Sequence, residues 1–284
     1  MNQITSVHIA DGHMHMLTLS SEQGAITVDG CHAVVYPRAH KPLDLALLPI
    51  APYLTHSSGS LVVTLGGGLF HIQRVPLELA SESDRIAQIK WEASQVLIES
   101  IDRYVIDFLP AGRVAFWTAI PQEVATGYTA YFSELGFDPI VIMPEPMALY
   151  ALGKHDPVGR NRGAMWVGHE WSSFVAIAND ALTVAETVNL RREPHQTSGT
   201  VSQIKKWIQG DLGMKRRRPA FDQILLCGEA NSMTVMASLL ADFKTPRIVP
   251  FDFSTYLPDI QTPDSTEGGS AQFALALGAA LAHA

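Results

Sequence analysis

The sequence predicts an α/β protein made of two similar halves. Segments with the alternating pattern of strands are interleaved with helical segments, and this order occurs twice along the 284 residues. Between the two series, residues 153–163 form a polar segment with Gly, Pro and charged residues. We therefore predict a first half over 1–152, a linker over 153–163 and a second half over 164–284.

The composition is that of a folded protein and excludes several functional classes. Hydrophobic residues make up 47% of the chain and charged residues 17%, and a chain of this length buries about 75% of its unfolded surface. The net charge of −8 gives no general attraction for nucleic acid or for an anionic membrane. Cys31 and Cys227 are too far apart in sequence to form a metal or redox motif, which fits a reducing compartment.

No segment has the length needed to cross a membrane as a helix. A spanning helix needs about 20 consecutive apolar residues. The longest apolar stretches are shorter, namely Leu45–Ala51, Leu61–Leu65 and Phe273–Ala282. The first residues also lack the basic region and apolar core of a signal peptide. We therefore expect a cytoplasmic protein that reaches a membrane only through a partner.

The first half is expected to begin with a β-hairpin. Apolar and polar residues alternate on both sides of Asp11-Gly12, which favours a two-residue turn. This turn pairs His8 with His15, so that His8, His13 and His15 share one face of the hairpin. Three imidazoles could bind a transition metal. We expect instead a half-buried polar face without a metal.

The first half continues with alternating strands and helices. Apolar residues repeat at helical spacing from Glu82 to Ser100, with Ser83 as the expected cap. Gly66-Gly67-Gly68 interrupts two strands and is not a phosphate loop, because no Lys-Ser/Thr follows. The other predicted elements are strands at 31–36, 60–65, 69–75, 104–109, 113–119 and 140–143 and helices at 121–135 and 145–152.

The second half repeats a meander of strands before its helices. Asn179-Asp180 predicts a tight turn between two of these strands. The predicted elements are strands at 164–167, 172–178, 182–190, 223–227 and 247–250 and helices at 198–212, 232–243 and 272–282. Residues 215–218 are all basic, and Lys205 and Lys206 precede them. On an acidic protein we expect this cluster to be a solvated loop or a site for an acidic partner.

Several short motifs occur in a fixed order along nearly the whole chain. The motifs are Ile89-Lys90-Trp91-Glu92-Ala93, Tyr104-Val105-Ile106-Asp107-Phe108, Glu145-Pro146-Met147-Ala148-Leu149 and Ile224–Ala230. In this order they resemble the PilM family of type IV pilus assembly. The resemblance implies an actin-like fold, that is, a ribonuclease H-like duplicated fold. It also implies a small α+β subdomain inserted in the first half at about 78–138.

The resemblance also implies where a nucleotide site would lie. In actin-like ATPases two hairpin turns hold the phosphates, an Asp orders the metal, and a late Gly-rich turn holds the nucleoside. If the site is retained, ATP and Mg²⁺ are the implied cofactors. The positions that correspond to cofactor-binding residues are Asp11, Gly12, His13, Glu145, Gly168, Ser172, Ser173, Gly228 and Glu229.

The chain departs from the family pattern at central positions of that site. Asp11-Gly12 forms a tight turn where the family has a longer loop, which leaves few free amides for phosphate. Trp166 stands where the family has an Asp, and Glu229 stands where a second Gly is usual. We therefore expect ATP binding to be reduced or lost, with no catalytic residues, no metal site and no required cofactor.

The expected function is that of a non-enzymatic scaffold at the cytoplasmic face of a pilus or secretion assembly. By resemblance, the chain would dock a short peptide of an inner-membrane partner in a groove beside the 78–138 subdomain, and it could also self-associate. Two alternatives remain open. One is an active, regulatory ATPase of the same fold. The other is a small-molecule kinase of the actin and sugar-kinase superfamily, which would need a catalytic Asp in the cleft.

Overall fold

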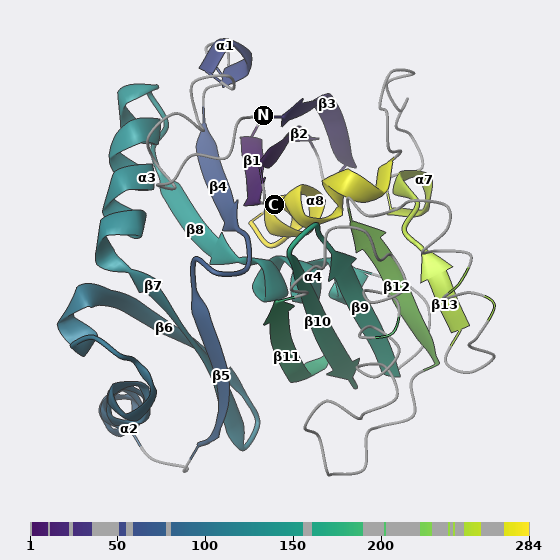
Figure 1. Ribbon diagram of the computed structural model, residues 1–284. Helices are drawn as coiled ribbons and strands as arrows, with labels where there is room; N and C mark the ends of the chain where they lie inside the picture. Colours follow the sequence, from purple (N-terminus) through teal and green to yellow (C-terminus); the bar gives the residue numbers. More distant parts are fainter. Residues whose placement is uncertain are drawn as a thin grey trace.

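A computed structural model (Figure 1) describes most of the chain. The described residues are 2–10, 12–22, 25–35, 51–54, 59–77, 81–155, 161–189, 202, 222–228, 238, 241, 247–256 and 270–283. The helices predicted at 198–212 and 232–243 and the basic cluster at 215–218 fall largely or wholly outside these residues.

The first half contains a five-stranded sheet with the order β3-β2-β1-β4-β8. Its first three strands form an antiparallel meander, and β4 and β8 then add in parallel to β1. The turn at Gly12 sets the register that the sequence predicts, with Ala10 opposite His13 and His8 opposite His15. The strands are β1 (Asn2–Ala10), β2 (His13–Glu22), β3 (Ala25–Val35), β4 (Ser60–Leu65) and β8 (Ile140–Pro144).

The second half repeats this topology in a sheet with the order β11-β10-β9-β12-β13. Again an antiparallel meander is extended by two parallel strands. Asn179 and Asp180 both have positive φ, as a tight hairpin turn requires. The strands are β9 (Asn161–Val167), β10 (Trp171–Ala178), β11 (Ala181–Asn189), β12 (Gln223–Gly228) and β13 (Arg247–Pro250). The duplicated α/β architecture is confirmed.

Two helices, α4 (Glu145–His155) and α8 (Ala274–Leu281), pack between the two sheets (Figure 1). They belong to one hydrophobic cluster that also takes residues from β1 and β2 of the first half and from β9, β10 and β12 of the second. The helices cross closely, because a Cβ at Gly278 would clash with the backbone carbonyl of Ala148. The main core therefore joins the halves instead of serving each separately.

A small α+β subdomain is inserted between β4 and β8. A three-stranded sheet of order β5-β7-β6 packs against α2, and α3 leads back to the first sheet. The N-cap of α2 is Ser81, which forms a capping box with Asp84, so the prediction of Ser83 was wrong by two residues. The elements are β5 (His71–Pro76), α2 (Glu82–Val96), a 3-10 helix (Ile101–Arg103), β6 (Tyr104–Ala111), β7 (Val114–Pro121) and α3 (Gln122–Glu134).

The remaining described elements are short. They are α1 (Ala51–Leu54), α7 (Phe253–Tyr256) and a 3-10 helix (Ser270–Phe273) that leads into α8. The predicted linker at 153–163 is shorter than expected, because α4 continues to His155 and β9 begins at Asn161. Within the described part of the chain, no helix has the length and hydrophobicity to cross a membrane.

Candidate functional site

The turns of the two predicted phosphate hairpins lie against each other. Gly12 and His13 end the β1–β2 turn, and Gly168 and His169 follow β9 in the second half. The imidazole rings of His13 and His169 stack with their centroids 4.8 Å apart. Residues that would flank the phosphates from opposite sides in an open site are therefore in direct ring contact. Asp11, the other predicted residue of the first turn, lies outside the described residues.

The histidine face of the first hairpin is more deeply buried than predicted. His8 and His15 are cross-strand partners whose rings stack at 5.8 Å, and His15 stacks on His13 at 6.4 Å. The exposed fractions of His8 and His15 are 0% and 1%, so the prediction of a half-buried face was wrong for these two residues, whereas His13 is half-buried. Burial lowers the pKa of His15 well below its usual 6.5, and neighbouring imidazoles lower it further. His8 and His15 are therefore part of the protein interior.

Glu145, the first residue of α4, connects the two halves by hydrogen bonds. Its Oε1 lies 3.0 Å from His8 Nε2, and its Oε2 accepts a hydrogen bond from Ser173 Oγ at 2.7 Å. Burial raises the pKa of the Glu145 carboxyl to about 8, although hydrogen bonds from Ser173 and the Gly67 amide oppose this shift. A protonated carboxyl at this place can donate to His8 while it accepts from Ser173.

Trp166 occupies the position where the family pattern has an Asp. Its side chain is 1% exposed, and its ring meets the edge of the His8 ring at 4.8 Å. The same ring also contacts His15. An aromatic residue from β9 thus covers the imidazoles of β1 and β2 in place of a carboxylate that could order a metal.

Trp171 seals the interface from the second half, a role that the sequence did not suggest. Its side chain lies over Gly67 and Gly68, and a Cβ at Gly67 would come within 2.7 Å of the Trp171 side chain. The glycine run predicted to be a strand kink therefore serves as a contact surface for a ring of the other half. Two glycines before a strand are a weak signal, because nothing in the sequence identifies the ring that covers them.

The other predicted site residues are in place but are engaged in packing. Ser172 and Ser173 are completely buried on β10, and Ser173 contacts Glu145 as described. Gly228 has φ of +136°, and a Cβ there would clash with the backbone of Val167. Close approach of β12 to β9 thus accounts for this glycine without a nucleoside. Glu229 lies outside the described residues.

Among the described residues, no group of three or more His, Cys, Asp or Glu side chains could hold a metal ion. Cys227 is buried near Glu145. Burial raises the pKa of the Cys227 thiol and keeps it protonated. The buried groups therefore form a hydrogen-bonded and stacked contact between the halves.

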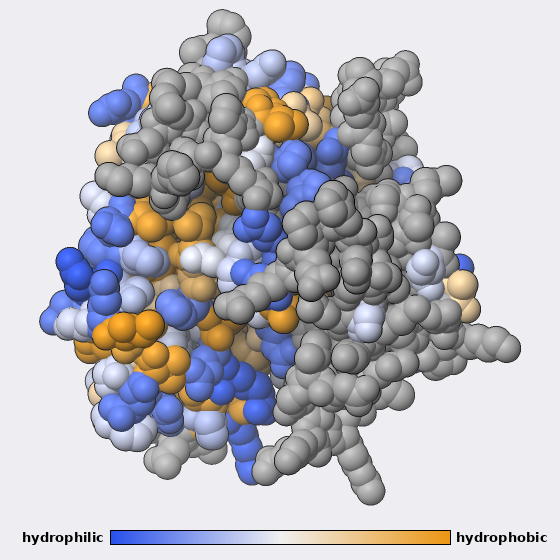
Figure 2. Space-filling model, in the orientation of Figure 1, coloured by the Kyte–Doolittle hydropathy of each residue, from blue (hydrophilic) through white to orange (hydrophobic). Residues whose placement is uncertain are grey.

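A groove of about 1000 Å³ opens between the inserted subdomain and the first sheet. One side is a face of the β6–β7 sheet made of the cross-strand pairs Val105–Ile120, Asp107–Thr118 and Leu109–Phe116. The other side is β8, all of whose residues from Ile140 to Pro144 line the groove. Figure 2 shows hydrophobic surface over β8 and beside it. The sequence did not identify these lining residues.

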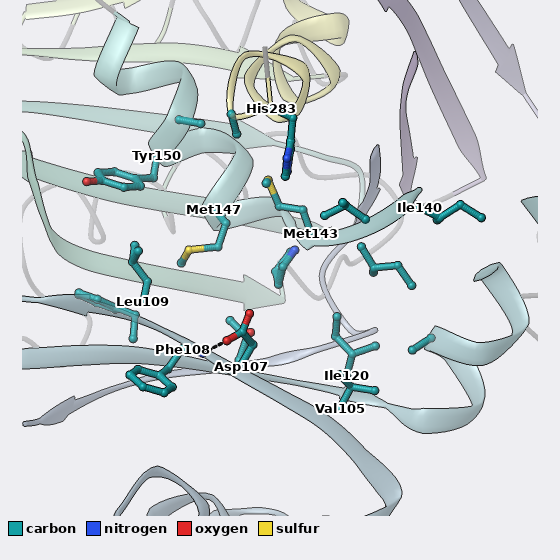
Figure 3. A pocket seen from close by; sticks show the side chains of 18 of the residues that line it. Val105, Asp107, Phe108, Leu109, Ile120, Ile140, Met143, Met147, Tyr150 and His283 are labelled. Carbon is teal, nitrogen blue, oxygen red and sulfur yellow. Dashed lines mark hydrogen bonds between the residues drawn. The ribbon is translucent and has the colours of Figure 1, made fainter. Parts of the chain in front are cut away.

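The walls of the groove are mainly apolar with a few charged groups (Figure 3). Met147 and Tyr150 of α4 line one wall, and Figure 3 shows Met143 and His283 on the same side of the cavity. Asp107 lies on the opposite side, where its carboxylate accepts a hydrogen bond from the Phe108 amide at 2.7 Å. The groove thus combines apolar walls with a small number of charged or polar side chains.

Comparison with known proteins bears on the fold. No protein-family model matches the sequence, and no curated protein is significantly similar to it. Among solved structures, a "PilM-PilN type IV pilus biogenesis complex" matches over 98% of both chains, with a TM-score of 0.76 and 16% identity. A Bacteroides thetaiotaomicron protein "with actin-like ATPase fold and unknown function" matches 88% of this chain and 91% of its own, with a TM-score of 0.58 and 11% identity.

A third similar structure comes from a secretion system. The cytoplasmic domain of EpsL, "an inner membrane component of the type II secretion system of Vibrio cholerae", matches 90% of this chain and 92% of its own. Its TM-score is 0.58 and its identity 13%. At these identities the similarities show the fold alone. The chain has the actin-like fold, as the motif order in its sequence predicts.

Proposed function

We propose that this chain is a non-enzymatic docking protein of a type IV pilus or related secretion assembly. It holds a short cytoplasmic peptide of an inner-membrane partner in the groove between the β6–β7 face and β8. The protein itself is cytoplasmic and lies at the membrane only through this partner. The similar structures support the proposal by what their names state, a pilus biogenesis complex and an inner-membrane secretion component.

The observation that carries the proposal is the contrast between the two candidate sites. At the position that the resemblance assigns to the nucleotide, His8 contacts both Trp166 and Glu145, and His13 stacks on His169 from the other half. The groove of about 1000 Å³ is open and apolar. Docking of a peptide does not require ATP hydrolysis, since the peptide binds through its contacts with the groove.

The test uses a fluorescein-labelled synthetic peptide that covers the short cytoplasmic tail of the inner-membrane partner, identified as a protein with one membrane span from the same organism's pilus or secretion genes. Fluorescence anisotropy with the purified full chain should show saturable binding. Met147→Lys places a charge on the apolar wall of the groove and should weaken binding by about tenfold or more. Ile98→Lys is the matched control, because Ile98 is 98% exposed and does not line the groove.

The outcome decides between the candidate functions. Equal binding by both variants would place the peptide elsewhere, and an absence of binding would overturn the docking proposal. If Mg-ATP instead produced saturable binding and measurable phosphate release, the chain would be an active ATPase of this fold.

A further inference from the structure

Among the described strands, the edge of β8 that faces the groove has no partner, and this edge specifies how a peptide would bind there. In the sheet order β3-β2-β1-β4-β8, β8 is the last described strand, and β4 is its one neighbour in that order. Strand edges that lie open on a protein surface recruit further strands and are normally blocked. Here the edge lies inside a groove whose other surfaces come from β6, β7, α3 and α4. It is sheltered from chance pairing and remains open to one extended segment.

The register of β8 identifies which of its backbone groups face the groove. Leu61 donates its N–H to the carbonyl of Pro139 at 3.0 Å and lies opposite Ile140. In a parallel ladder, alternate residues of a strand direct both N–H and C=O to the same side. Residues 139, 141 and 143 therefore bond to β4, while Ile140 and Ile142 direct their N–H and C=O groups to the open side. No hydrogen bond to these groups occurs among the described residues.

The second free edge beside the groove, β6, is less suited to pairing. β6 is the last strand of the order β5-β7-β6. The Phe108 amide on this strand is already bonded to the carboxylate of Asp107. The next residue along that edge with the same orientation is Pro110, which has no N–H to offer. On the other side of Phe108, the Tyr104 amide is bonded to the carbonyl of Ile101, so Ile106 has no outward neighbour with an available N–H. Of the two edges, only β8 presents consecutive outward residues with both groups available.

The chemistry of the facing wall specifies the side chains of the bound segment. Two apolar pairs, Val105–Ile120 and Leu109–Phe116, flank the pair Asp107–Thr118 on the β6–β7 face. A strand bound along β8 would direct alternate side chains toward this face. Apolar side chains fit the outer pairs, and a basic side chain fits the carboxylate of Asp107. Cytoplasmic segments next to a membrane span are enriched in Lys and Arg, which suits this arrangement.

We infer that the partner peptide binds by strand addition to the free edge of β8, as a sixth strand of the first sheet, with a Lys or Arg side chain facing Asp107. The segment is extended, about four to six residues long, because β8 itself has five residues. It alternates apolar side chains around the basic one. This inference rests on the proposed function, since it assumes that a membrane partner's tail occupies the groove.

The first test is an N-methyl scan of the tail peptide used above. Each backbone amide of the peptide is methylated in turn, and the affinity for the full chain is measured by anisotropy. Strand addition predicts an alternating result, in which amides that face β8 lose about tenfold or more in affinity and their neighbours lose little. A uniform response along the peptide would overturn strand addition and leave the docking proposal standing. No binding of the unmodified peptide would overturn both.

The second test reads the protein side of the same contact. Ile142→Pro removes the outward N–H, and Ile142→Ala removes only the side chain, so the Pro variant should bind about tenfold more weakly than the Ala variant. Residue-level hydrogen exchange on the wild-type chain makes the test independent of folding effects. Peptide binding should slow exchange at Ile140 and Ile142 and leave Val141 and Met143 unchanged. Equal protection of all four amides would contradict the inference.

The charge contact is tested by reversal. Asp107→Lys should weaken the peptide with its natural basic residue and strengthen a peptide in which that residue is replaced by Glu. The two changes together should restore most of the lost affinity. Equal affinities for the two peptides in both protein variants would remove Asp107 from the contact.

Discussion

At the scale of single residues, the interface between the halves is a set of aromatic and hydrogen-bonded contacts around the buried carboxyl group of Glu145. The shared face of His8, His13 and His15 follows from the Asp11-Gly12 turn and was predicted. Their burial was not predictable, because it depends on Trp166 and on α4, which are more than a hundred residues away in sequence. The register of a hairpin depends on its local sequence, whereas the burial of its side chains depends on segments that are distant in sequence.

Restoring the family carboxylate at Trp166 should not restore nucleotide binding. Trp166→Asp removes a fully buried ring and should destabilise the fold by about 3–5 kcal/mol or more, since an unpaired carboxylate is left in the interior. Thermal unfolding with and without Mg-ATP measures both effects, and Trp166→Phe is the milder control. The prediction would be wrong if the Trp166→Asp variant were stable and its melting temperature rose with Mg-ATP. In that case Trp166 alone would block nucleotide binding.

Glu145 should make the stability of the protein fall as the pH rises from about 4.5 to about 8. Its folded pKa of about 8 lies above the usual 4.5, so its stabilising contribution is complete below about pH 4.5 and is lost as pH rises through 8. In that window the dependence approaches about 1.4 kcal/mol per pH unit. Glu145→Gln cannot ionise and should flatten the dependence between pH 6.5 and 8. Urea unfolding at several pH values measures this, and parallel curves for both proteins would contradict the assignment.

At the scale of elements, strands and their turns were predicted well and contacts between distant elements were not. Local sequence pattern is enough to predict the strand meanders of both halves and the Asn179-Asp180 turn. It also predicts α2 and α3, the two helices of the subdomain. The end of α2 at Val96 and the extension of α4 to His155 were missed, because tertiary packing decides where a helix stops. The β6–β7 face shows the same limit. Its alternating residues predict a sheet but do not reveal that β8 lies opposite.

In the loop between β4 and β5, even the replacement of Gly67 by Ala should lower the stability of the protein. Gly67→Ala places a Cβ within 2.7 Å of the Trp171 side chain, so the ring must move and the halves must separate slightly. We expect a loss of about 1–3 kcal/mol in the free energy of unfolding. Gly30→Ala is the matched control, because its nearest atom, His32 Nε2, is 3.7 Å away. Chemical denaturation compares the two, and equal stabilities would mean that the contact carries no weight.

At the scale of the whole molecule, one core joins two halves that would have to hinge apart in an active ATPase. α4 and α8 lie inside this core, and the side chains at the nucleotide position add contacts across the same boundary. The duplicated actin-like fold was predictable because a weak motif order extends over nearly the whole chain. The groove was expected only as a location beside the subdomain. Its lining requires the three-dimensional arrangement of four segments.

We propose that the groove binds a peptide and that the nucleotide position binds no nucleotide. Isothermal titration calorimetry on the full chain measures both, first with Mg-ATP and then with the membrane partner's tail peptide. We expect no heat of binding for Mg-ATP at concentrations that would detect an affinity of about 100 μM, and one peptide site whose affinity is the same with and without nucleotide. Saturable binding of Mg-ATP, or a peptide affinity that depends on Mg-ATP, would overturn this proposal.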